Sequence, residues 1–226
     1  SCVAKIFGCS DSTAFNFNPL ANTDDPNIPC IQRVLGCMNP NASNYDPLAT
    51  SSTAFGGILD PNNASGAYYN GDQHLIFDAF VESKIVSADV YAQANNTITF
   101  ELRDGNGAIL DDTTIAVSTG QQRLYFDFDV PVGSNYQLGL APGSTSDLYR
   151  NNDQAGVNYP YNIGGLIEIT ESSAGALGYP NQYYYFFYDI EVEAVCVGVS
   201  SPILGCTNPN ACNYDPAVIS LKNRLN

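Results

Sequence analysis

Residues 36–47 have the sequence GCMNPNASNYDP, and residues 205–216 repeat it as GCTNPNACNYDP, with ten of the twelve positions identical. A more divergent copy, GCSDSTAFNFNP, occupies residues 8–19. Proline locks the backbone dihedral φ and disfavours helix in the residue before it. Segments so rich in proline and asparagine are typical of stiff loops, and they have too few apolar side chains to form a core of their own.

All cysteines of the chain lie in or beside these copies, and residues 38–195 contain none. Short segments without a core are commonly held together by disulfides, which persist in oxidising compartments. A zinc site is the alternative, but the sequence has no CxxC pair and its single histidine, His74, lies far from the cysteines. We therefore predict a secreted protein with disulfides. The cysteines are Cys2, Cys9, Cys30, Cys37, Cys196, Cys206 and Cys212.

Each copy begins with Gly-Cys and follows an earlier cysteine, so the repeats divide into units with an opening cysteine, a stiff body and a closing cysteine. This division pairs Cys9 with Cys30, in a loop whose closure contributes about 3 kcal/mol. It also pairs Cys37 with Cys196, which is the next cysteine along the chain. We therefore expect the cysteine-free part of the chain to be inserted into the second unit.

The same division leaves three cysteines without an assigned partner. Cys2 would close a unit that begins before this chain, and Cys206 would open one that closes beyond it. Cys212 has no counterpart in the other two copies, where Phe15 and Ser43 stand. Cys212 can pair with Cys206 or bond to another chain, and the sequence leaves both alternatives open.

Between the second and third units, short runs of alternating, β-branched and aromatic residues replace the repeats. In the run RLYFDFDV, every second residue from Leu124 to Val130 is apolar, and the residues between are Tyr125 and two aspartates. This period of two is typical of a strand with one buried and one solvated face. Eight or nine such runs, separated by turns such as DGNG, predict an all-β fold, an antiparallel β-sandwich of jelly-roll type.

These patterns give four segments. We assign residues 1–35 to a first repeat region, residues 36–54 to a second unit, residues 55–196 to the β-sandwich and residues 197–226 to a third unit. Within the sandwich, the run YYYFFYDIE at residues 183–191 has aromatic residues at both phases of the alternation. That pattern predicts one central strand buried on both faces.

Charge and composition exclude several classes of function. Eight basic against 23 acidic residues give a net charge of -15, which disfavours binding to nucleic acid or anionic lipid. No apolar run is long enough to cross a membrane, so we expect no membrane insertion. The sequence contains one histidine and no recognisable nucleophile motif, so we do not expect an enzyme.

Two clusters rich in tyrosine and asparagine, GAYYNGDQH and LYRNNDQAGVNYPYNIGG, lie in segments that the pattern predicts to be loops. Tyrosine rings and planar polar side chains together can stack on sugars and bind their hydroxyl groups. The simpler interpretation is that these residues fill turns and pack on one another. The candidate glycan-binding residues are Tyr68, Tyr69, Asp72, Tyr149, Arg150, Asn151, Tyr159 and Tyr161.

The repeats also contain oxygen ligands of the kind that calcium prefers. The candidate calcium residues are Asp24, Asp25, Asn39 and Asp46. The ligand order of a calcium-binding loop is missing, however, and side chains of this type more often cap their own turns. Calcium therefore stays one of two interpretations of these residues.

The phrase GCTNPNACNYDP resembles the tandem repeats, roughly GCTDPxACNYDPxAxxDDGSC, of large secreted and cell-surface proteins of Bacteroidota. Many of those proteins are exported by the type 9 secretion system, and some are linked to adhesion. The segments VNYPYNIGGLIEIT and YYYFFYDIEVE are similar to a β-sandwich module of such proteins. The resemblance covers nearly the whole chain and implies an extracellular, cell-surface setting, without assigning a ligand.

Two functions follow as hypotheses. The first is a structural or adhesive surface protein, in which the repeats are rigid spacers and copies associate with one another, head to tail, into a filament or sheath. The second is a carbohydrate-binding module of a secreted multidomain enzyme, with a polysaccharide or glycan as partner.

Overall fold

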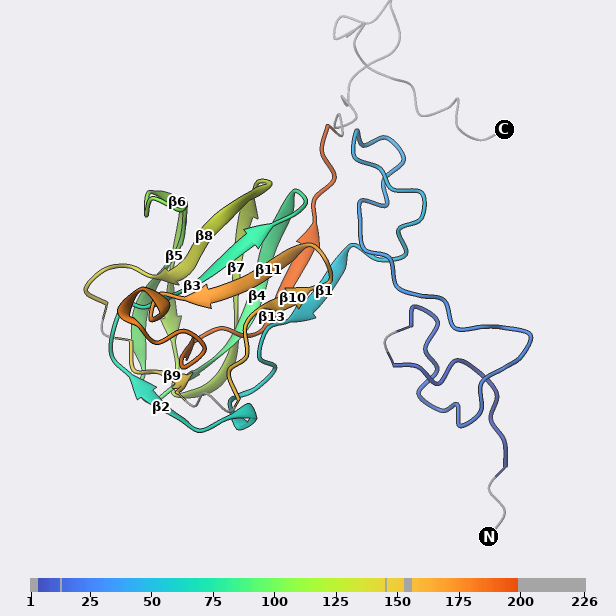
Figure 1. Ribbon diagram of the computed structural model, residues 1–226, viewed down its shortest axis with the longest axis horizontal. Helices are drawn as coiled ribbons and strands as arrows, with labels where there is room; N and C mark the ends of the chain where they lie inside the picture. The colour runs from blue at the N-terminus through green and yellow to red at the C-terminus, as the bar shows by residue number, and fades with distance from the viewer. Residues whose placement is uncertain (1–3, 13, 145, 153–155, 199–226) are drawn as a thin grey trace, which may run out of the picture.

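The computed structural model describes residues 4–12, 14–144, 146–152 and 156–198. Figure 1 shows a two-layered body of strands, with the repeats of residues 4–52 running along one side of it. The strands begin at Thr53 and end at Ala194. Two three-residue 3-10 helices interrupt the strands, η1 (Pro61–Asn63) and η2 (Gly175–Leu177).

The strands form two sheets, and all their pairings are antiparallel. The first sheet contains β1 (Thr53–Gly56), β2 (Gly66–Tyr69), β4 (Ser83–Ala92), β7 (Gly120–Val130), β9 (Leu148–Asn151), β12 (Tyr184–Tyr185) and β13 (Tyr188–Ala194). The second contains β3 (His74–Ala79), β5 (Asn96–Arg103), β6 (Ile109–Val117), β8 (Gly133–Leu140), β10 (Tyr161–Ile163) and β11 (Ile167–Ser172).

Eight of these strands have the connectivity of a jelly roll. They lie in the order β1-β13-β4-β7 in the first sheet and β3-β8-β5-β6 in the second, and the chain crosses repeatedly between the two sheets. Strands β10 and β11 extend the second sheet beyond β3, while β2, β9 and β12 extend the first beyond the end of β4. The predicted antiparallel sandwich of jelly-roll type is confirmed.

The core lies between the sheets, where the alternating pattern places it. In β7, Leu124, Phe126, Phe128 and Val130 are buried, whereas Tyr125 and the aspartates between them are exposed. Phe126 packs against Phe100 across the two sheets, with ring centroids 5.2 Å apart. Because whole aromatic side chains are removed from water there, burial of apolar surface is the main force that holds the sandwich together.

The prediction of one central strand over residues 183–191 is wrong in detail. The segment forms β12 and β13 with a sharp turn between them, at Phe186 and Phe187. Phe186 has a left-handed backbone, with φ of 69°, and the amide of Phe187 donates a hydrogen bond to the carbonyl of Tyr185, 2.9 Å away. Both phenylalanines are fully buried, so the turn places rings in the core where an extended strand would have alternated them.

In the part of the chain that the structure describes, no helix has the length and apolar character needed to cross a bilayer.

Candidate functional site

The first repeat unit is a stapled loop with a defined docking surface. We call residues 8–19 its opener and residues 29–31 its closing segment. The disulfide Cys9–Cys30 joins the two, with Cα atoms 5.0 Å apart. Asn16 holds the closing segment from both sides, because its Oδ1 accepts from the amide of Ile31 at 2.8 Å and its Nδ2 donates to the carbonyl of Pro29 at 3.1 Å. The amide of the residue before Asn16 donates to the carbonyl of Ile31 at 2.8 Å.

The second unit repeats this arrangement with a closing segment from the other end of the sandwich. Its opener is residues 36–47 and its closing segment is residues 195–197. Cys37 bonds to Cys196 across a sequence separation of 159 residues. Oδ1 of Asn44 accepts from the amide of Val197 at 2.8 Å, and its Nδ2 donates to the carbonyl of Val195 at 2.7 Å. The amide of the residue before Asn44 again donates to Val197, at 2.8 Å.

Both predicted disulfides that fall within the described residues are therefore present, and the sandwich is inserted into the second unit as expected. The closing segments share only a cysteine followed by a β-branched residue, Ile31 or Val197. In each unit two hydrogen bonds to the closing segment come from one asparagine and one from a main-chain amide, and in unit 2 the hydroxyl of Ser43 adds a fourth, to the carbonyl of Val197 at 3.0 Å. Cys2, Cys206 and Cys212 lie outside the described residues, and the predictions for them stay predictions.

The four candidate calcium residues make local contacts. Asp24 accepts from the amide and the hydroxyl of Ser10, at 2.9 and 2.7 Å, and these hydrogen bonds lower the pKa of Asp24. Asp25, Asn39 and Asp46 each accept from the amide two residues ahead, at 2.9, 3.0 and 2.9 Å. These are the turn caps of the alternative interpretation. The described residues contain no group of three or more His, Cys, Asp or Glu side chains that could hold a metal. Calcium binding itself stays a prediction.

Part of each tyrosine cluster comes together on two short strands, which the sequence predicts to be loops. Tyr68 and Tyr69 lie on β2, which pairs with β9, so that Tyr68 stands opposite Tyr149. Their rings meet edge to face with centroids 5.4 Å apart. Sequence missed both strands because they are only four residues long and their alternation is too short to recognise.

Arg150 lies within a group of tyrosine rings. Its guanidinium carbon is 3.8 Å from the ring centroid of Tyr69, 4.4 Å from that of Tyr183 and 5.5 Å from that of Tyr185. Its Nη1 donates to the hydroxyl of Tyr185 at 3.1 Å. No carboxylate of the described residues forms an ion pair with it. Because the guanidinium occupies these ring faces, they are not open for stacking on a sugar.

Two other candidates have structural contacts. Asn151 is fully buried, and its Nδ2 donates to the carbonyls of Pro61 and Ala64 while its Oδ1 accepts from the hydroxyl of Tyr188. Asp72 is exposed and accepts from the amide of Gly143 at 3.1 Å. Both side chains fix the backbone of neighbouring loops.

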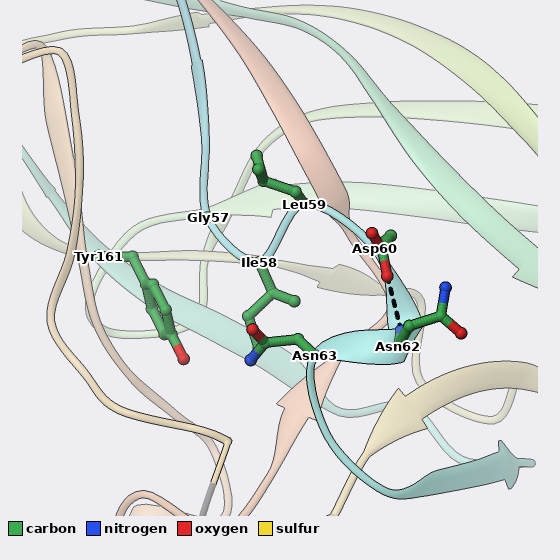
Figure 2. A pocket seen from close by; sticks show the side chains of 7 residues that line it. All are labelled: Gly57, Ile58, Leu59, Asp60, Asn62, Asn63 and Tyr161. Carbon is green, nitrogen blue, oxygen red and sulfur yellow. Dashed lines mark hydrogen bonds between the residues drawn. The ribbon is translucent and has the colours of Figure 1, made fainter.

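Tyr161 lines a shallow cavity of about 320 Å³, and the ring of Tyr159 packs edge to face on Tyr161 with centroids 5.2 Å apart. Figure 2 shows Tyr161 facing Ile58 across it, with η1 on the other side. The hydroxyl of Tyr159 donates to the carbonyl of Tyr183 at 2.9 Å, and burial raises the pKa of Tyr159. Asp60 is the one ionisable carboxylate of the described lining, and it already accepts from the amide of Asn62 at 2.7 Å. This cavity is at the lower end of the size of ligand pockets and lacks a free reactive group.

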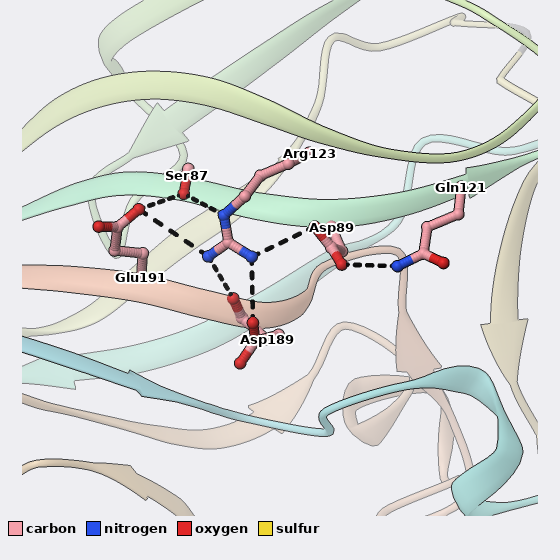
Figure 3. A network of polar contacts seen from close by, with 6 residues as sticks. All are labelled: Ser87, Asp89, Gln121, Arg123, Asp189 and Glu191. Atoms are coloured by element: carbon pink, nitrogen blue, oxygen red, sulfur yellow. Dashed lines mark hydrogen bonds and ion pairs between the residues drawn. The ribbon is translucent and has the colours of Figure 1, made fainter.

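Sequence did not single out a polar network on the outer face of the first sheet. Figure 3 shows the guanidinium of Arg123 among three carboxylates. It lies 3.2 Å from Asp89, 3.0 Å from Asp189 and 3.9 Å from Glu191. Its Nε donates to Ser87, which donates in turn to Glu191 at 2.5 Å. These residues come from β4, β7 and β13, so only the pairing register of the strands brings them together.

The single histidine is half-buried at the start of β3. Burial of its ring, assisted by the positive charge of Arg103, lowers the pKa of His74 to about 4, although Asp72 acts in the opposite direction. A shift of this kind makes the stability of the fold depend on pH.

We predict that acidification weakens the fold through His74. Below pH 6.5 the unfolded chain binds a proton at this residue, but the folded chain does not until about pH 4. The free energy of unfolding should therefore fall by about 2–3 kcal/mol between these pH values, less where water reaches the ring. Urea unfolding at a series of pH values should show a shallower decline for His74→Gln than for the wild type. Parallel curves would contradict this.

Comparison of the chain with protein-family models, curated proteins and solved structures gave no match. The likeness of the repeats to cell-surface proteins of Bacteroidota stays a prediction from sequence.

Proposed function

We propose that this chain is an extracellular, non-catalytic structural protein with an adhesive role, in which the repeat units form a spine and the jelly roll is carried at its side. Disulfides support an extracellular setting, because they persist in oxidising compartments. The candidate residues for chemistry are engaged in packing and turn capping, which favours a structural role.

The observation that carries this proposal is the shared docking pattern of the two closing segments. In unit 1 the closing segment follows its opener after a sequence separation of 21 residues, and in unit 2 after 159. The disulfide, the two asparagine hydrogen bonds and the main-chain hydrogen bond are common to both units, so docking does not depend on how the two segments are connected. A jelly roll can therefore be carried on a unit without breaking the series of units along the side of the body (Figure 1).

Because docking does not depend on how the two segments are connected, a closing segment could also come from another copy, which supports head-to-tail joining of copies. Cys2 precedes Cys9 by seven residues, as Cys30 precedes Cys37, and it is followed by Val3 as Cys196 is followed by Val197. Residues 205–216 have the sequence of an opener, with Asn213 at the position of Asn44. Both segments lie outside the described residues, so their sequences alone support this step. We propose that the third opener of one copy binds the Cys2 segment of a second copy.

The joint would be covalent. The thiols of Cys206 in one copy and Cys2 in the other lose two protons and two electrons, which pass to a disulfide oxidant that is reduced to two thiols. Head-to-tail contacts between identical subunits propagate as filaments unless the rotation closes a ring.

Non-reducing electrophoresis of the full chain, oxidised in a glutathione redox buffer, tests this joint. The wild type should form a ladder of covalent multimers that collapses on reduction. Cys2→Ser and Cys206→Ser should each stop the ladder, and a mixture of the two variants should give dimers only, because each supplies one half of a single joint. Electron micrographs of the wild type should show filaments or closed rings.

Cys212→Ser is the matched control, since the proposal gives that cysteine no part in the joint. A ladder that persists in the Cys2→Ser/Cys206→Ser double variant would contradict the proposal. So would a wild type that stays monomeric under oxidising conditions.

A further inference from the structure

We infer that the outer face of the first sheet binds an uncharged polysaccharide. The face is defined by two exposed aromatic residues, Phe55 and Tyr125, and by the polar network around Arg123. This inference deepens the adhesive part of the proposed function by naming a ligand class, and it places the site away from the tyrosine clusters on β2 and β9.

The two aromatic residues stand at opposite edges of one row of side chains. Phe55 on β1 is opposite Glu191 on β13, Glu191 is opposite Ser87 on β4, and Ser87 is opposite Tyr125 on β7. Three strand spacings separate the Cα atoms of Phe55 and Tyr125 by about 14 Å, a length that several linked sugars cover. Tyr125 is 63% exposed and Phe55 is 51% exposed, although apolar rings of this size are usually covered. Tyr125 thus offers an open stacking surface at one end of the row, and the half-exposed ring of Phe55, which has the guanidinium of Arg123 over one face, offers a second at the other end.

The groups between the rings are held in place before any ligand arrives. Arg123 donates to Ser87, to the carboxylates of Asp89 and Asp189, and to the main-chain carbonyl of Asp189. Its guanidinium also reaches the ring of Phe55, 5.3 Å away. Since these contacts fix the side chains, binding would cost little of their rotational freedom.

The network nevertheless keeps free acceptors for sugar hydroxyl groups. No hydrogen bond from the described residues reaches Oδ1 of Asp189 or Oε1 of Glu191. Carboxylate oxygens accept from hydroxyl groups in short, charge-assisted hydrogen bonds. A pyranose between the rings could therefore donate to this centre while a neighbouring sugar stacks on Tyr125.

The negative charge of this face determines which polysaccharides can bind to it. One guanidinium faces three carboxylates in the network, and the next cation along the face, Lys84, is already paired with Asp129 at 3.0 Å. Uronate and sulfate groups would meet repulsion from this surface. The same repulsion disfavours a second copy of this acidic chain as the occupant. An uncharged chain of pyranoses avoids both penalties.

An open cavity of about 500 Å³ lies at one end of the face, between the sheet and the second repeat unit. It is lined by Met38 and Asn39 of the unit and by Lys84 and Glu193 of the sheet. Glu193 is two residues from Glu191 along β13, so the cavity lies about 7 Å from the row, in the direction of the strands and at right angles to the row. The repeat unit thus borders the face on the side of this cavity.

Affinity electrophoresis and calorimetry of the full chain on soluble polysaccharides test the inference. The panel contains the uncharged polymers β-glucan, mannan and xylan and the anionic polymers alginate and pectin. We expect binding to at least one uncharged polymer and at least tenfold weaker binding by Tyr125→Ala and Phe55→Ala. Tyr68→Ala is the matched control, since Tyr68 is an exposed tyrosine at the other candidate site, and its affinity should be unchanged.

Circular dichroism and thermal melting should show that all three variants keep the wild-type fold, since each replaces an exposed ring. The inference is overturned if the wild type binds none of the uncharged polymers, or binds only the anionic ones. It is also overturned if Tyr125→Ala binds as the wild type does, or if Tyr68→Ala alone loses binding. The covalent ladder should be the same in all three variants, so that failure of this inference and failure of the proposed function are separate results.

Discussion

Replacing Cys37 and Cys196 together with serine should lower the free energy of unfolding of the jelly roll by about 5 kcal/mol and its melting temperature by about 15 °C. The disulfide closes a loop with a sequence separation of 159 residues. Without it, the unfolded chain regains the entropy that the long loop had lost, while the native contacts of β1 and β13 stay the same. Calorimetry of the double variant measures the shift.

The Cys9→Ser/Cys30→Ser variant is the control. That disulfide closes a loop with a separation of 21 residues, and its loss should destabilise unit 1 by about 3 kcal/mol without moving the melting transition of the jelly roll. Limited proteolysis should then cut residues 8–31 first. Equal effects of the two double variants on the main transition would contradict the assignment of the second disulfide to the jelly roll.

The second large effect concerns the ion pair on β5. Glu101 and Arg103 are almost completely buried, with 5% and 9% of their side chains exposed, and Nε of Arg103 donates to Glu101 at 2.6 Å. Arg103 also donates to the carbonyl of Leu140. Glu101→Leu leaves the guanidinium buried without its counter-charge, and we expect a loss of about 3–5 kcal/mol in the free energy of unfolding.

The Glu101→Leu/Arg103→Met double variant should recover most of that loss, because it removes both charges and buries apolar side chains of similar volume. Urea unfolding of the wild type, both single variants and the double variant gives the coupling energy. If the losses of the two single variants add up in the double variant, the two charges do not share a desolvation cost. Each side chain would then stabilise the fold separately.

The fold was largely predictable because the long strands of the sandwich have one buried and one solvent-exposed face. Long strands such as β7 alternate apolar and polar residues over eight or more positions, and that pattern has one structural explanation. The disulfides were predictable because the repeats order the cysteines along the chain. The four-residue strands β1, β2 and β9 were not, since short elements are fixed by their neighbours and not by their own pattern.

The candidate binding face could not be predicted from the sequence, for a different reason. Phe55, Ser87, Tyr125 and Glu191 are scattered over 137 positions, and only pairing register puts them in one row. The sequence pointed to the tyrosine-rich segments as candidate binding sites because their residues are contiguous. Contiguity and exposure are independent, however: the contiguous rings of Tyr69 and Tyr183 pack on Arg150, whereas Tyr125 stays open and Phe55 stays half exposed beside Arg123.

The insertion of the jelly roll into the second unit has a mechanical consequence. Its two ends leave through segments that are joined by a sulfur bridge, with Cα atoms 5.0 Å apart. Tension applied along the chain from either side passes through that bridge and bypasses β1 and β13. The sandwich is thereby shielded from load, and pulling cannot unravel it while the bridge is intact. Reduction would place the enclosed chain, about 500 Å when fully extended, directly in the path of the force.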